Sequence, residues 1–138
     1  MKPHPPSLAE EAIRAVTANG YETQPGFCQR FVREIIQHCC GDRYNAYFAP
    51  DAVATARRFE HAGWGLEPER GSKPGDLLYK LSGSGGFGHV GIRVSGNRVS
   101  GNRVAENSHV HYDPDTRDAR GFRTLREFGD YDLIVRLP

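Results

Sequence analysis

Three kinds of side chain with complementary chemistry occur far apart in the chain: Cys28, His89, and the adjoining pair Glu106 and Asn107. A cysteine attacks as its thiolate, so a catalytic cysteine needs a lowered pKa, which a helix N-terminus or a nearby imidazole provides. The imidazole in turn needs an acceptor that fixes its tautomer and orientation. A thiol, an imidazole and a carboxylate or amide therefore predict nucleophilic catalysis, with Cys28, His89 and Glu106 or Asn107 as candidates.

Each candidate also has a purely structural explanation. Cys28 lies on the apolar stripe of an expected helix, where cysteine is often a small buried residue. Cys39 and Cys40 fit that explanation better, because they lie at the far end of the helix, where its dipole disfavours a thiolate. Three cysteines without a CxxC spacing predict neither a disulfide scaffold nor a zinc site.

The first 63 residues have helical patterns and the remainder reads as strands and turns. A capping box at Ser7–Glu10 opens the first expected helix, and the second carries apolar residues at helical spacing. The helices are expected from Ser7 to Asn19–Gly20, from about Phe27 to Cys40, and from Pro50–Asp51 to Gly63. Strands are expected at 76–81, 89–94, about 103–111 and 131–137. Helices followed by antiparallel strands predict an α+β fold.

The length of 138 residues corresponds to one domain. Residues 1–6 are expected to be a disordered tail. The formal charge is +1, from 18 Lys and Arg against 17 Asp and Glu, which argues against a nucleic-acid binder. No apolar run reaches the roughly 20 residues of a membrane span, and the N-terminus lacks the apolar stretch of a secretory signal. We therefore expect a protein that is cytoplasmic as synthesised and does not insert into membranes.

Four segments around the candidate residues resemble those of papain-like cell-wall hydrolases, namely the CHAP domains and their NlpC relatives. The segments are Gly26–Val32 (GFCQRFV), Lys73–Tyr79 (KPGDLLY), Gly88–Ile92 (GHVGI) and Val104–Asn107 (VAEN). They span essentially the whole chain in the order found in that superfamily. The resemblance implies a papain-like fold, with N-terminal helices packed on a C-terminal antiparallel sheet.

The same resemblance implies a peptidoglycan hydrolase that cleaves amide bonds in bacterial cell-wall peptide, as an endopeptidase or an N-acetylmuramoyl-L-alanine amidase. Cys28 would be the nucleophile, His89 the base, and Glu106 or Asn107 the orienting group, with no cofactor and no metal. The enzyme would reach the wall after phage lysis or secretion-system delivery, as an endolysin or an antibacterial effector, with any secretion or immunity partner unknown. Two alternatives stay open: the same thiol machinery acting on another amide or thioester, and a non-catalytic wall-binding or interaction module.

The chain departs from the CHAP pattern at two positions. Phe27 stands where these domains usually carry a glutamine whose amide helps to bind the oxyanion. The E-x-N arrangement of the family would also place asparagine at Ser108, whereas this chain has it at Asn107.

Strand parity offers a choice between the two orienting residues. A two-residue turn at Gly96–Asn97 would put His89 opposite Val104, so that the even-numbered residues of the strand at about 103–111 share the face of His89. This register favours Glu106, whereas a loop of odd length would present Asn107.

Three further features carry weaker predictions. Trp64 lies between two glycines and could line a substrate groove or anchor the edge of the core. The sequence SGNRV at 95–99 recurs at 100–104 and is interpreted as a duplication that lengthens a hairpin. His109, His111 and Asp113 alternate along one strand, but a polar strand end followed by a turn explains them better than a metal site.

Overall fold

The computed structural model describes residues 7–17, 28–82, 88–94, 103–113, 118–127 and 130–138; residues 16, 17, 28, 103–113 and 118–127 are described by their backbone. Its helices are α1 (Leu8–Thr17), α2 (Cys28–Cys40), α3 (Ala52–His61) and the 3-10 helices η1 (Gly41–Tyr47) and η2 (Pro68–Arg70). Its strands are β1 (Gly65–Leu66), β2 (Leu77–Lys80), β3 (His89–Arg93), β4 (Arg103–Asp113), β5 (Asp118–Glu127) and β6 (Leu133–Val135).

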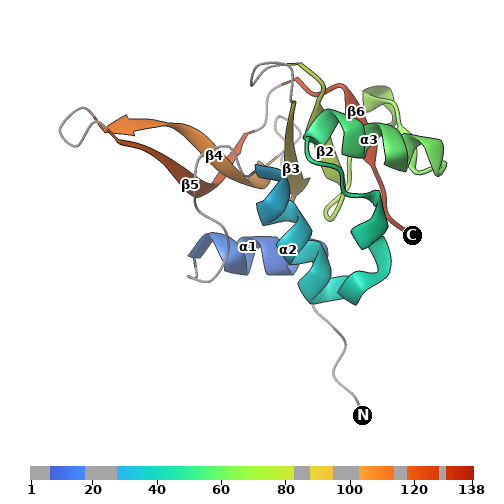
Figure 1. The fold of residues 1–138 in the computed structure, drawn as a ribbon, viewed down its shortest axis with the longest axis horizontal. Coiled ribbons are helices and arrows are strands. Elements are labelled where there is room, and N and C mark those ends of the chain that lie inside the picture. Colours follow the sequence, from blue (N-terminus) through green and yellow to red (C-terminus); the bar gives the residue numbers. More distant parts are fainter. Residues whose placement is uncertain (1–6, 18–27, 83–87, 95–102, 114–117, 128–129) are drawn as a thin grey trace, which may run out of the picture.

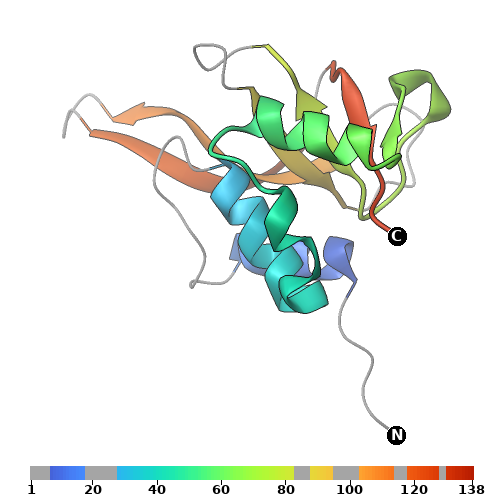
Figure 2. The same ribbon diagram turned by 45° about the vertical axis from the view of Figure 1, so that its right-hand side comes forward.

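The strands form one sheet of six in the order β1-β6-β2-β3-β4-β5, in which every pair is antiparallel. The α+β class expected from the sequence is therefore confirmed. At one edge of the sheet, β4 and β5 extend as a long two-stranded ribbon beyond the remaining elements (Figures 1 and 2).

The helices cover one face of this sheet, and the main core lies between the two layers. Alternate strand residues join the buried faces of all three α-helices in a single cluster, which includes Phe31, Val32, Ile35, Ile36, Phe59, Leu77, Tyr79, Val90, Ile92 and Val135. The intervening residues of β2 and β6, Leu78 and Ile134, form a separate small cluster on the other face. The assignment of each strand residue to a face follows from this division.

Local signals in the sequence explain where the helices begin and end. The backbone N–H of Glu10 donates to the Ser7 hydroxyl at 3.1 Å, and that of Ala54 donates to the Asp51 carboxylate at 2.7 Å. These are the N-caps that the sequence predicts for α1 and α3. Gly41 follows α2 with a φ of 67°, a conformation in which glycine is favoured at helix ends.

Several elements differ from the sequence-based expectation. The chain continues from α2 directly into η1, where the pattern indicated only that Gly41 stops the helix. The pattern did not predict β5, which pairs with β4 from Arg103↔Glu127 to Asp113↔Asp118, with a register shift between Ser108 and His111. Residues 1–6 and most of the SGNRV duplication lie outside the described residues. Within the described part of the chain, no helix combines the length and apolar character needed to cross a membrane.

A polar clamp stabilises the face of the sheet away from the helices. The Asp76 carboxylate, almost fully buried, accepts hydrogen bonds from the Arg136 guanidinium at 2.8 and 3.0 Å and from the Lys73 backbone N–H at 2.8 Å. Next to it, the Arg93 side chain donates to the hydroxyl and the carbonyl oxygen of Ser72. Asp76 of the PGDL segment thus holds the turn before β2 against the chain after β6, which is a structural role.

Candidate active site

Cys28 is the first residue of α2 that the structure describes. The backbone N–H groups of a first helical turn have no partner within the helix and carry the positive end of its dipole. That environment lowers the pKa of a thiol placed there. The Cys28 side chain lies outside the described part of the structure, so only its backbone position is fixed here.

The segment before α3 links the start of α2 to the start of α3. The side-chain amide nitrogen of Gln29 donates a hydrogen bond to the backbone carbonyl oxygen of Ala49. The backbone N–H of Ala49 in turn donates to the hydroxyl of Thr55 in α3 at 2.8 Å. This pair of bonds ties the first turn of α2 to the first turn of α3.

Gly88, the residue before His89, lies directly against the same turn of α3. A Cβ atom at Gly88 would be 2.8 Å from the Val53 side chain and 2.7 Å from the Lys80 carbonyl oxygen, so no larger residue fits without a shift. Its φ of 79° also favours glycine. The starts of α2, α3 and β3 therefore meet at one corner of the fold, which holds the backbones of both Cys28 and His89.

Within β3, His89 alternates with the residues of the main core. Val90 and Ile92 are fully buried under the helices, whereas His89, Gly91 and Arg93 belong to the opposite face. His89 is half-buried and pairs with Lys80 of β2. Since it is the first residue of the strand, its ring has to turn around the strand end to meet a thiol on the helical side.

The two orienting candidates lie on β4, next to β3. The register pairs Arg93 with Val104 and Ile92 with Ala105. The pairing of His89 with Val104, expected from a two-residue turn, is therefore wrong by four residues. Because four is an even number, the parity survives: continuing the register puts Glu106 opposite Gly91, diagonal to His89. Asn107 then occupies a position of the other face; the side chains of both residues lie outside the described part.

Trp64 belongs to an aromatic cluster at the opposite end of α3. Its ring contacts the rings of Tyr44, Tyr47 and Phe59 at centroid distances of 5.6, 5.0 and 6.0 Å. Val53 and the end of α3 are about 12 Å apart along the helix axis at 1.5 Å per residue. The structure thus places Trp64 at the edge of the core and does not bring it to the corner of Cys28 and His89.

The other two cysteines lie at the C-terminal end of α2 as free thiols. Burial, followed by the neighbouring Cys40 and Glu11, raises the pKa of Cys39 to about 11. Burial also raises the pKa of Cys40. Neither environment activates a thiol, which agrees with the structural explanation that the sequence favours for both.

Gln29 is a residue of this corner that the sequence-based reasoning missed. Its carbonyl oxygen is buried and has no hydrogen-bond partner among the described side chains, while its amide nitrogen holds Ala49. A polar residue directly after the candidate nucleophile, in the first turn of an amphipathic helix, is the signal that could have identified it.

Among the described side chains no group of three or more metal-binding residues occurs, and His109, His111 and Asp113 lie outside them.

Comparison of the chain with models of known protein families, with curated proteins and with solved structures finds no match. The likeness to wall hydrolases therefore rests on the short segments around Cys28, Asp76, His89 and Glu106.

Proposed function

We propose that this protein is a thiol hydrolase of papain-like arrangement that cleaves amide bonds in bacterial wall peptides. The observation that carries the proposal is the corner at which Cys28 of α2 and His89 of β3 are each followed or preceded by a residue held at the first turn of α3, namely Gln29 through Ala49 and Gly88 against Val53. Thiolate chemistry requires a cysteine whose pKa is lowered, as it is at a helix N-terminus, and a base within hydrogen-bond reach of the thiol.

In this mechanism His89 accepts the proton of the Cys28 thiol, and the thiolate attacks the carbonyl carbon of the scissile amide. The backbone N–H groups in the first turn of α2 donate hydrogen bonds to the oxyanion that forms. His89 then returns the proton to the leaving amine, which gives an acyl-enzyme. A water molecule, deprotonated by His89, hydrolyses the thioester and restores the thiol.

Glu106 is the proposed acceptor for the second ring nitrogen of His89. The register of β3 and β4, continued beyond the pair Ile92↔Ala105, supports this choice over Asn107, because it would put Glu106 diagonal to His89. A carboxylate there would favour the imidazolium that forms when the thiol ionises.

Gln29 has a positioning role in this proposal. Its hydrogen bond to Ala49 fixes the first turn of α2 relative to α3 and hence relative to Gly88. Loss of that bond would change the distance between thiol and imidazole without removing either group. A displacement of about 1 Å at a reacting atom can reduce a rate by about a hundredfold.

A specific observation favours a second candidate, a non-catalytic wall-binding or interaction module of the same fold. The alternation of β3 assigns His89 to the face away from the helices, with Gly91 and Arg93. A histidine that stays on that face cannot serve a nucleophile on the helical side. The absence of glutamine before the cysteine, where Phe27 stands, points the same way.

Digestion of purified sacculi by the full chain tests the proposal. Wild type and a Cys40→Ala variant are expected to release soluble fragments, whereas Cys28→Ala and His89→Ala release none and keep the wild-type circular dichroism spectrum. Mass spectrometry of the fragments then identifies the bond, since an amidase separates the stem peptide from muramic acid and an endopeptidase cuts within or between stems. Undiminished release by Cys28→Ala would overturn the hydrolase. Binding of sacculi by wild type without any release would support the second candidate.

A further inference from the structure

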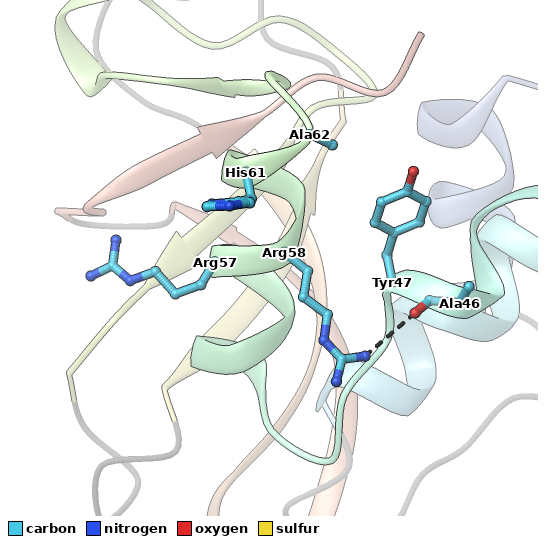
Figure 3. Close-up of a pocket in the computed structure, with 6 residues that line it drawn as sticks. All are labelled: Ala46, Tyr47, Arg57, Arg58, His61 and Ala62. Atoms are coloured by element: carbon cyan, nitrogen blue, oxygen red, sulfur yellow. Dashed lines mark hydrogen bonds between the residues drawn. The ribbon is translucent and has the colours of Figure 1, made fainter.

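A depression lies at the far end of α3, away from the corner of Cys28 and His89. It is an open pocket of about 620 Å³ between η1 and the last turns of α3, lined by Ala46, Tyr47, Arg57, Arg58, His61 and Ala62. Figure 3 shows Tyr47 and Ala46 on one side of it and α3 on the other, with the Arg58 side chain reaching across one end. Two alanines at its rim leave the space open.

The wall formed by Tyr47 is held rigidly from behind. Its ring stacks on Phe59 at a centroid distance of 5.4 Å and 18° between planes, and it contacts Trp64 at 5.0 Å. An aromatic ring fixed by two others presents an apolar surface and a polar donor to a ligand at little entropic cost.

The donors of the pocket are incompletely used by the protein. Arg58 makes one long hydrogen bond, from Nη1 to the Ala46 carbonyl oxygen at 3.4 Å, within the described part of the chain. Arg57 is exposed and pairs with Glu60 at 2.9 Å. Arginine presents several N–H donors in a planar fork that matches an oxyanion with two oxygens.

The charge around the pocket selects among oxyanions. Arg57 and Arg58 provide two permanent positive charges and His61 a third when protonated, while Glu60 removes one. The C-terminal end of α3 adds partial negative charge through the helix dipole. This modest positive excess suits a single carboxylate beside an apolar group better than a phosphate dianion or a polyanion.

Basic residues at a helix C-terminus also complement the helix dipole, and that explanation suffices for Arg58 and His61 taken alone. It does not explain the hollow between the two helices or the Tyr47 ring of η1 that is stacked beside it. We propose that this pocket binds the free carboxylate of a peptide, with Arg58 holding the carboxylate and the adjoining apolar side chain lying on Tyr47. The proposal goes beyond the hydrolase and does not depend on it.

Isothermal titration calorimetry tests the pocket with N-acetyl-alanyl-leucine as the free acid and, in parallel, as the C-terminal amide. The acid is expected to bind at least tenfold more tightly than the amide. Arg58→Gln is expected to lower the affinity for the free acid about tenfold, in line with the loss of a charged hydrogen bond. Arg58→Lys is expected to lower that affinity less. Arg43→Gln is the control, because Arg43 is an exposed residue of η1 outside the pocket, over the Tyr44 ring.

Equal affinity for acid and amide would overturn the proposal, since the pocket would then recognise only apolar surface. Tighter binding of inorganic phosphate than of the free acid would overturn it in favour of a phosphate site. Unchanged thermal unfolding of Arg58→Gln shows that its loss of binding is local. All titrations are repeated with Cys28→Ala: binding that persists while sacculi remain undigested separates this proposal from the hydrolase.

Discussion

The ionisation of Cys28 gives the sharpest test of the proposed mechanism, because Cys39 of the same helix serves as an internal reference. Burial, Cys40 and Glu11 raise the pKa of Cys39 to about 11. At pH 7 about one Cys39 side chain in ten thousand is then a thiolate, because each pH unit below the pKa lowers that fraction about tenfold. Cys39 should therefore be almost inert toward iodoacetamide near neutral pH.

A Cys28 thiol activated by the start of α2 and by His89 should have a pKa within the range of about 3.5–7.5 seen for such cysteines. A pKa of about 6 would leave roughly nine in ten Cys28 side chains ionised at pH 7, against about 3% for an unperturbed thiol with a pKa of about 8.5. A thiolate of lower pKa is also a weaker nucleophile, by about half a logarithmic unit per pKa unit. The two effects nearly cancel at neutral pH, so the pH profile of the rate is the quantity to measure.

The assay is alkylation over a range from about pH 5 to about pH 10, with mass spectrometry of tryptic peptides. Trypsin separates the two regions, because Cys28 falls in the peptide 15–30 and Cys39 with Cys40 in the peptide 34–43. The midpoint for Cys28 is expected below pH 7 in wild type and to rise in His89→Ala toward the value of about 8.5 of a free thiol, stopping short of it because the start of α2 still acts on the thiol. A wild-type midpoint at or above about 8.5 that His89→Ala leaves in place would refute the mechanism.

Two further expectations concern the free energy of unfolding, measured by urea denaturation. Gly88→Ala should lower the free energy of unfolding by about 3 kcal/mol, because the new Cβ collides with the Lys80 carbonyl and Val53. Gly41→Ala is the control, since Gly41 also has a positive φ but lies in open space, and it should lower the free energy of unfolding by only about 1 kcal/mol. Equal losses would contradict the close approach at Gly88. Asp76→Asn should lower it by about 2 kcal/mol, because it weakens a buried clamp with Arg136, whereas Glu60→Gln, in an exposed pair with Arg57, should change it by less than about 0.5 kcal/mol. An Asp76→Asn protein as stable as Glu60→Gln would show that the clamp contributes nothing.

The helices could be predicted because their signals are local. Phe31, Val32, Ile35 and Ile36 repeat at helical spacing and are all buried in the structure. The caps at Ser7 and Asp51 depend only on residues within one turn. Such features need no knowledge of the rest of the fold.

Elements that depend on distant partners were harder to predict. The segment 118–127 has few apolar residues and no alternation, and it forms β5 because β4 offers a long edge with which to pair. Similarly, η1 continues from α2 because Tyr44 packs into the core and its hydroxyl donates to the carbonyl oxygen of Pro138 at the other end of the chain. No local sequence signal within 41–47 predicts the packing of Tyr44 or its hydrogen bond to Pro138.

The candidate site shows the same division at the level of single residues. The placement of Cys28 at the described start of α2 and of His89 at the start of β3 could be predicted from local pattern, and the parity of the β3–β4 pairing agrees with the prediction although the register differs by four residues. Besides their direct packing in the core, α2 and β3 are joined at this corner by α3 and the segment before it, through Ala49, Thr55 and Val53. Gly88 is required by that packing, because any side chain would push His89 away from α3. The glycine before the histidine thus allows the start of β3 to lie directly against the first turn of α3.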